Sequence, residues 1–168
     1  MLIRAETDGD HATIAEINRA AFASDEEPRL VELIRRDGLI IASLVAVDGS
    51  ELVGHILFSP ATIVTGNNEM KVASLAPMAV MPSRQRAGIG SMLVRRGLDA
   101  CKDAGYRAVI VVGHPNYYPR FGFSHPIVEG LTNPFATGDA FMGLELARGC
   151  LANLVGRIEY PDVFNRLS

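Results

Sequence analysis

The sequence predicts an α/β protein with a mixed central sheet and helices on both faces. Two apolar runs joined by Asp48-Gly49-Ser50 indicate an antiparallel hairpin, because Asp-Gly is a strong signal for a tight turn. Later, the strand 72–80, the helix that follows residue 88 and the apolar strand 107–112 form a crossover unit. Such units make their two strands parallel neighbours. Antiparallel and parallel pairs together define a mixed sheet.

The first half of the chain contributes short strands and two amphipathic helices. Residues 2–5 predict a strand, and apolar residues then recur at helical spacing through Ile14, Ile17, Ala21 and Phe22. The segment 24–28 ends this helix, and a second helix carries Leu30, Leu33 and Ile34. The hairpin strands 44–47 and 52–58 follow, and Ser59-Pro60 is expected to end or bend the second of them.

The second half of the chain predicts the crossover and a late strand. Gly66-Asn67-Asn68 indicates another tight turn, and Pro77 predicts a bulge in strand 72–80 because proline has no N–H to give to a neighbour. Gly105 is well placed to cap the long helix. Residues 141–146 predict a further strand. The tail 158–161 is one more strand or a docking segment.

Length and composition limit the classes of function that the chain can have. The 168 residues suit one domain spanning 1–168, and an apolar share of 48% excludes a disordered chain. A net charge of -3 argues against a general nucleic-acid binder, which would be basic. Two cysteines make no disulfide framework and favour a reduced, cytoplasmic protein. The longest apolar run, around 39–47, is too short to span a membrane.

The turn at residues 82–91 is the most informative motif. Gly88 and Gly90 allow the backbone to approach a ligand closely. The helix that begins there offers unpaired N–H groups, which suit a phosphate. Nearby arginines add positive charge: Arg84, Arg86, Arg95 and Arg96. A Gly-x-Gly pair without a third glycine or a Walker-type lysine is a weak signal, so a packed strand–turn–helix corner is the alternative.

The pattern Gln-x-x-Gly-x-Gly at Gln85, Gly88 and Gly90 resembles the acyl-CoA pyrophosphate loop of the GNAT N-acetyltransferase superfamily. The preceding segment 75–80 is similar to the fourth strand of that family, and segment 117–123 is similar to its Tyr-x-x-x-Gly-Phe motif. The resemblance extends over residues 2–147 and is nearest to a bacterial subgroup of predicted acetyltransferases. It implies a GNAT-like acyl-CoA N-acyltransferase fold.

The resemblance also implies how the chain meets its ligands. Acetyl-CoA, as co-substrate, is expected to lie on one continuous set of residues: Met78, Ala79, Val80, Gln85, Arg86, Ala87, Gly88, Ile89, Gly90 and Ser91. The pantetheine arm is expected in a gap that the strand bulge opens. The first two helices are expected to form one wall of the acceptor site, where the acidic cluster Asp25, Glu26 and Glu27 faces a substrate amine or is simply a solvated turn.

Acetyl transfer by direct attack needs no enzyme nucleophile, and the sequence offers no convincing Ser-His-Asp or Cys-His set. Backbone N–H groups around Met78 to Val80 are expected to stabilise the oxyanion. The family pattern selects Tyr118 rather than Tyr117 as the general acid. The general base stays open among a water chain and four side chains: Glu26, Glu27, Glu51 and His55.

Two classes of function follow. One is an acetyltransferase acting on a small-molecule or peptide amine, and the other is a sensor or scaffold that binds acyl-CoA without turnover. No residue spacing indicates a metal site. The sequence leaves open which amine accepts the acyl group, whether that group is longer than acetyl, and whether the chain forms a homodimer.

Overall fold

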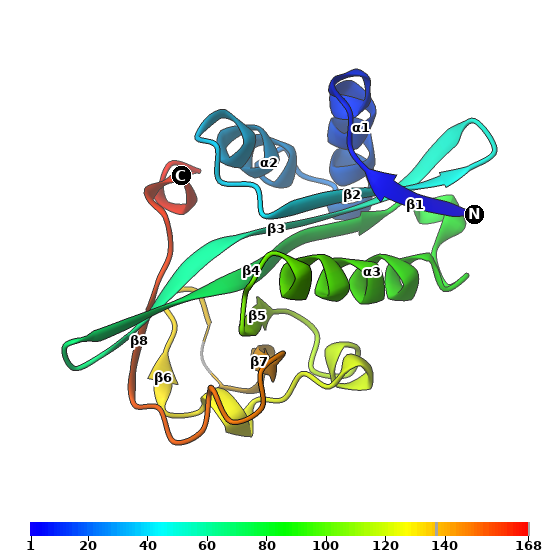
Figure 1. The fold of residues 1–168 in the computed structure, drawn as a ribbon. Helices are drawn as coiled ribbons and strands as arrows, with labels where there is room; N and C mark the ends of the chain where they lie inside the picture. The colour runs from blue at the N-terminus through cyan, green and yellow to red at the C-terminus, as the bar shows by residue number, and fades with distance from the viewer. Residues whose placement is uncertain (137, 168) are drawn as a thin grey trace.

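The computed structural model describes residues 1–136 and 138–167, and its centre is a mixed eight-stranded sheet (Figure 1). The strands run along the chain as β1 (Leu2–Ala5), β2 (Ala42–Asp48), β3 (Glu51–Thr65), β4 (Asn68–Val80), β5 (Ala108–Val112), β6 (Leu131–Thr132), β7 (Phe141–Glu145) and β8 (Gly156–Glu159). Their main order is β1-β2-β3-β4-β5-β7, while β8 pairs with β3 and β6. Within the described residues, β4–β5 and β6–β8 are the parallel pairs.

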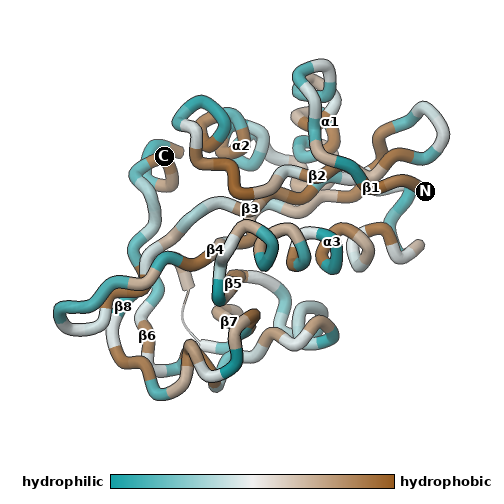
Figure 2. The backbone as a smooth tube through the Cα atoms, in the orientation of Figure 1, coloured by the Kyte–Doolittle hydropathy of each residue, from teal (hydrophilic) through white to brown (hydrophobic). Residues whose placement is uncertain are grey.

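Three α-helices in the described residues cover the sheet, and they lie on both faces as the sequence predicts. Helices α1 (His11–Phe22) and α2 (Glu26–Arg36) cover one face, and α3 (Ile89–Asp103) covers the other (Figure 1). Many residues of the central strands between these helices are hydrophobic (Figure 2). Leu57 packs with α1 and α2, whereas its neighbours Ile56 and Phe58 pack with α3. This alternation follows from the two-residue period of a strand.

Of the two outcomes expected at Ser59-Pro60, an end or a bend of the strand, the end is wrong, because β3 continues to Thr65. On the side away from β4, β2 pairs with β3 as far as Phe58, and β8 pairs with it only from Thr62. Pro60 falls between these two pairings. A strand residue without an N–H is tolerated in such a position.

The break between the first two helices is also shorter than predicted. Helix α2 begins at Glu26, so Glu27 and Pro28 belong to its first turn. Proline is tolerated there because the first N–H groups of a helix have no partner inside it. Glu27 is therefore held by a regular helix and not by a flexible turn.

The predicted bulge in β4 is confirmed. Ile56 pairs with Met78 and Phe58 pairs with Leu75, so β4 contains one residue more than β3 between these pairs, at Ala76-Pro77. The parallel pairing of β4 with β5 stops at Leu75 and Val111. From the bulge onward β4 is paired with β3 alone among the described strands, and a cavity between β4 and β5 is lined by Ala76 to Met78 and by Val112.

The tail forms a strand, so the first of the two alternatives is correct. β8 pairs with the distal half of β3, and the short helix 162–165 follows it. Val163 of that helix is fully buried against the cluster of α1 and α2. The end of the chain lies beside α2 (Figure 1), and Phe164 lines a cavity together with Leu75 and Val112.

Candidate active site

The glycine turn lies between the end of β4 and the start of α3. Arg86 has a φ of 64° and Gly88 has a φ of 84°, so two left-handed residues curl the chain before the helix. The first α-helical hydrogen bond is donated by the Met92 N–H to the Gly88 carbonyl at 3.1 Å. The N–H groups just before Met92 have no partner within the helix. The turn thus presents several donors and the positive end of a helix dipole to one place.

Gln85 fixes this turn to the strand. Its Nε2 donates a hydrogen bond to the Val80 carbonyl at 3.0 Å. That carbonyl belongs to the last residue of β4, beyond the point at which β4 and β5 separate. The side chain therefore couples the glycine turn to the free end of the strand.

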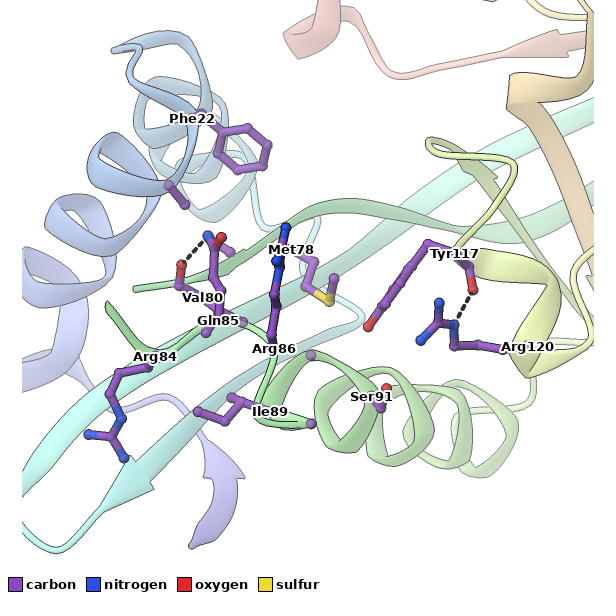
Figure 3. Close-up of a pocket in the computed structure, with 14 residues that line it drawn as sticks. Phe22, Met78, Val80, Arg84, Gln85, Arg86, Ile89, Ser91, Tyr117 and Arg120 are labelled. Atoms are coloured by element: carbon purple, nitrogen blue, oxygen red, sulfur yellow. Dashed lines mark hydrogen bonds between the residues drawn. The ribbon is translucent and has the colours of Figure 1, made fainter. Parts of the chain in front are cut away.

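The turn and the free end of β4 enclose a cavity of about 550 Å³ (Figure 3). All of the predicted ligand-binding residues except Ala87 line it. Four further residues line this cavity that the predicted ligand-binding set did not include: Ala21, Phe22, Tyr117 and Arg120. Their positions depend on how α1 and the loop after β5 pack against the turn, and no local pattern reveals that.

Not all of the arginines that the sequence predicted around this cavity are available to a ligand. Arg84 makes ion pairs with Asp48 and Glu51 of the β2–β3 hairpin, and its side chain points away from the cavity (Figure 3). Arg95 stacks on Phe121 with 5.2 Å between its guanidinium carbon and the ring centroid. Arg86 and Arg120 remain as cavity-lining cations without a carboxylate partner among the described residues. Two cations, free backbone donors and a glycine turn fit a phosphate-bearing ligand.

A second cavity of about 480 Å³ adjoins the first and shares Phe22, Met78 and Tyr117 with it. Tyr118 lines only the second cavity, and its ring lies between Tyr117 and Phe123 with centroid distances of 5.1 and 5.8 Å. Burial, with a smaller effect of Tyr117, raises the pKa of Tyr118 to about 12. Tyr118 is therefore protonated at neutral pH and able to donate.

Tyr117 separates the two cavities. Its hydroxyl approaches α3 so closely that a Cβ added to Gly90 would lie 2.8 Å from the Oη atom. Arg120 packs on the other face of its ring at 4.4 Å from the centroid and donates to the Tyr117 carbonyl at 2.9 Å. The two tyrosines thus occupy different places, with Tyr117 over the glycine turn and Tyr118 toward the second cavity.

The second cavity narrows the choice of a general base. Glu27 lines it from α2, and His114 lines it from the loop after β5. Of the rest of the acidic cluster, Asp25 pairs with Arg19 at 2.6 Å and Glu26 is exposed outside both cavities. Glu51 lies at the β2–β3 hairpin beside Arg84. His114 was not foreseen, although a loop at the carboxyl end of a parallel strand is a common place for functional residues.

His55 is fully buried and belongs to a chain of polar side chains that crosses the sheet. The Asn18 amide nitrogen donates to His55 Nδ1 at 3.1 Å, so Nε2 carries the proton and donates to Ser43 Oγ at 2.9 Å. Ser43 in turn donates to Glu6, whose carboxylate also accepts two hydrogen bonds from Arg35. Burial lowers the pKa of His55 to about 4. A neutral, enclosed imidazole does not reach an acceptor amine, so its role is structural.

This burial predicts a pH dependence of stability. The folded-state pKa of His55 lies near 4 and its unfolded value near 6.5, so the unfolded chain binds the additional proton between these values. The contribution of His55 to the free energy of unfolding should therefore be fully present above pH 6.5. It should decrease as the pH falls from 6.5 toward 4. From pH 6.5 to 4.5 the loss is roughly 2 to 3 kcal/mol. Urea unfolding at a series of pH values measures it.

Two variants separate His55 from other groups. His55→Gln should flatten the slope between pH 6.5 and 4.5, while His114→Gln, at an exposed position, should keep it. The lowered pKa of Glu6 affects stability only below about 4.5, outside this window. An unchanged slope in His55→Gln would contradict a neutral, buried imidazole.

The comparisons with known proteins agree with this architecture. A family model described as an acetyltransferase (GNAT) domain matches residues 2–125. YhbS of Escherichia coli strain K12, described as an uncharacterized N-acetyltransferase, is 35% identical over 168 residues, which is 99% of each chain. The crystal structure of E. coli YhbS in complex with CoA has a TM-score of 0.89 at 34% identity, covering 99% of this chain and 93% of that one.

A second solved structure, a GNAT family acetyltransferase from Brucella melitensis in complex with acetyl-CoA, has a TM-score of 0.80 at 32% identity and covers 97% of both chains. In this chain β4 and β5 separate beside a glycine turn and the N-terminus of α3. This arrangement defines an acyltransferase of the type that the resemblance predicted. The chain belongs to the GNAT family of acetyltransferases.

Across residues 1–136 and 138–167, no group of three or more His, Cys, Asp or Glu side chains is arranged to hold a metal ion. Within the same residues, no helix has the length and apolarity needed to cross a membrane.

Burial raises the pKa of the Cys101 thiol to about 12, so this cysteine is a neutral core residue.

Proposed function

We propose that this chain, acting as one domain over residues 1–168, transfers an acetyl group from acetyl-CoA to a small-molecule or peptide amine. The observation that carries the proposal is the junction of the two cavities. One holds the glycine turn and the cationic side chains, the other holds Tyr118 and Glu27, and both are lined by Met78 and Tyr117. Complexes of the two relatives with CoA and acetyl-CoA support the choice of co-substrate.

The residues that line the two cavities have different roles in this proposal. Acetyl-CoA supplies the thioester, and the N–H groups of the glycine turn with Arg86 and Arg120 would hold its phosphates. The N–H groups of a strand point alternately to its two sides, and Met78 to Val80 pair with β3 but not with β5. Those that point away from β3 would stabilise the oxyanion. Residues 78–80, Gln85, Arg86 and Gly88 to Ser91 form this ligand site.

The second cavity supplies the proton transfers. Glu27 takes a proton from the acceptor ammonium, so that the neutral nitrogen forms a bond to the acetyl carbon as the carbon–sulfur bond breaks. Tyr118 gives a proton to the departing sulfur, and the second proton, which the new amide nitrogen must lose, restores the Tyr118 hydroxyl. General acid and base groups must lie within reach of the reacting atoms, and both side chains line the cavity that contacts Met78 and Tyr117.

The assay that tests the proposal is release of free CoA thiol from acetyl-CoA across a panel of amines. We expect amine-dependent release and an acetylated product by mass spectrometry. A protein that is stabilised by acetyl-CoA but releases no thiol with any amine would instead be an acyl-CoA sensor or scaffold. The placement of Glu27 and Tyr118 in one cavity favours turnover over that second function.

The phosphate site makes its own prediction. Gly88→Val and Gly90→Val should each weaken acetyl-CoA binding by about tenfold or more, as measured by calorimetry. Gly88 has a φ of 84°, and a left-handed conformation costs other residues about 1 to 2 kcal/mol. A valine would relieve this strain by moving the turn out of the conformation that holds the phosphates, and its branched side chain would block their approach. A loss of about 1.4 kcal/mol in binding is a factor of ten in affinity. At Gly90 a new Cβ would meet the Tyr117 hydroxyl at 2.8 Å.

Gly66→Val is the matched control for Gly88→Val. Gly66 has a φ of 57°, nothing lies within 4 Å of an added Cβ, and it sits in the β3–β4 turn. It should lose stability without losing acetyl-CoA affinity. Folded Gly88 and Gly90 variants with wild-type affinity would show that the ligand phosphates bind elsewhere.

A further inference from the structure

A third cavity, of about 170 Å³, continues the second one on the side away from the glycine turn. The two cavities share Leu75, Ala76 and Val112, the residues at which β4 and β5 part. Beyond them, three aromatic residues from late in the chain form the wall: Phe135, Tyr160 and Phe164. The three cavities therefore form one chain from the phosphate turn, past Tyr118, to an aromatic end.

The aromatic end is prearranged. The rings of Phe135 and Tyr160 lie 4.9 Å apart, and Phe164 lies 5.0 Å from Tyr160. Buried Asn133 holds the loop that carries Phe135, because its Oδ1 accepts from the Phe135 N–H at 2.9 Å and its Nδ2 donates to the Tyr160 hydroxyl at 2.8 Å. Even so, 49% of Phe135 is exposed. A large apolar ring that is fixed and yet left open to solvent is suited to contact a ligand.

Exposed apolar side chains gather along these cavities. Phe22 and Val112, which are 42% and 40% exposed, line the second cavity with Leu30 and Leu75. Among the residues that the structure describes, Glu27 is the one carboxylate that lines this cavity, and no charged side chain lines the aromatic end. A polycation such as an aminoglycoside or a polyamine would need several carboxylates to replace its solvation. This surface instead matches one ammonium group joined to an apolar body.

We propose that Phe135, Tyr160 and Phe164 form a distal acceptor subsite, and that the acceptor is a primary amine with an extended aromatic or alkyl substituent. This inference rests on the proposed function, since it places the ammonium group at Glu27 and Tyr118. A cavity of about 150 Å³ is known to hold a benzene ring, and the aromatic end has similar room. The family model ends at residue 125, so these rings belong to a part of the chain that it does not describe.

The test is a series of ω-phenylalkylamines with one to six methylene groups, compared with propylamine and spermidine. In the wild type, kcat/KM should rise with chain length to an optimum and exceed that of propylamine, with spermidine among the poorest. Phe135→Ala should lower kcat/KM for the best phenylalkylamine by roughly 10-fold and leave propylamine unchanged. Phe135→Leu should retain part of the preference. Val155→Ala, at an exposed apolar residue outside the three cavities, is the control.

Direct binding separates this inference from the proposed function. Calorimetry of the CoA-free protein with the same amines should show Phe135-dependent binding whether or not turnover occurs. Turnover of propylamine and phenylalkylamines at equal rates, with no Phe135-dependent binding, would overturn the subsite and leave the acetyltransferase proposal standing. Binding without any thiol release would sustain the subsite and refute the acetyltransferase proposal. A Phe135-dependent dimer in sedimentation would show that a second copy of the chain covers these rings, and would overturn the inference.

Discussion

Tyr118→Phe should lower kcat by about 100- to 10,000-fold, the usual contribution of a general acid. The change removes the hydroxyl proton and keeps the ring, which packs between Tyr117 and Phe123. The fold and the affinity for acetyl-CoA should therefore survive, because Tyr118 does not line the cavity of the glycine turn. Stopped-flow or steady-state thiol release on the best acceptor measures the rate, and calorimetry measures the affinity.

The pH profile gives a second measure of the same group. Burial raises the pKa of Tyr118 to about 12, so the hydroxyl should stay protonated and kcat should show no alkaline decline from this residue below about pH 11. A thiolate leaving group has a pKa near 8 to 9. The proton is therefore not transferred downhill, and the benefit comes from placing the donor at the sulfur. An alkaline decline that disappears in Tyr118→Phe would contradict the raised pKa.

Tyr117→Phe is the matched control, because the two tyrosines are neighbours in sequence and differ in place. The Tyr117 hydroxyl lies over Gly90, whereas Tyr118 lines only the second cavity. Tyr117→Phe should change kcat much less. If Tyr117→Phe instead loses the rate and Tyr118→Phe keeps it, the acid is Tyr117. If neither variant is slower, water protonates the thiolate or it leaves unprotonated.

Structural features that are set by one or two consecutive residues could be predicted from the sequence. Asp48-Gly49 marked the hairpin turn, Pro77 marked the bulge, and Gly88 with Gly90 marked the turn before α3. Each is a consequence of the backbone freedom or the missing donor of one or two residues. The resemblance then placed these local features in one fold, and the mixed sheet with helices on both faces agrees with it.

Features that depend on packing between distant segments were not accessible. Arg84 has the right position for a phosphate ligand, yet Asp48 pairs with it from a hairpin 36 residues away. His55 could be a base by residue type, but its role follows from Asn18, Ser43 and Glu6 on three other segments. A sequence reports the chemistry of such side chains and not their partners, which determine whether a group is available.

The composition of the acceptor cavity shows the same limit. Glu27, His114 and Tyr118 come from α2, the loop after β5 and the short helix 118–121, and the splaying of β4 from β5 brings them around one space. Glu27 was one of four side chains considered, and its neighbour Glu26 looked equivalent in sequence. The helical start at residue 26 distinguishes them, because successive residues on a helix point about 100° apart.

The difference between these two glutamates leads to the other prediction with a large effect. Glu27→Gln should lower kcat/KM for the amine by about 100- to 10,000-fold near neutral pH, as expected for the loss of a general base. The amide keeps the size and polarity of the side chain and cannot accept the ammonium proton. Glu26→Gln is the matched control, since Glu26 is exposed outside both cavities. Its kcat/KM should stay within about twofold of the wild-type value, a change of less than 0.5 kcal/mol in the barrier.

The pH dependence distinguishes catalysis from simple attraction of the ammonium group. A primary amine has a pKa near 10, so a growing fraction of it is neutral as the pH approaches that value. The deficit of Glu27→Gln should therefore shrink steadily from pH 7 to 10 if the lost function is proton removal. If Glu27 only attracts the positive charge, Glu27→Gln should raise KM and leave kcat unchanged. If His114→Gln reproduces the pH-dependent deficit and Glu27→Gln does not, His114 is the base.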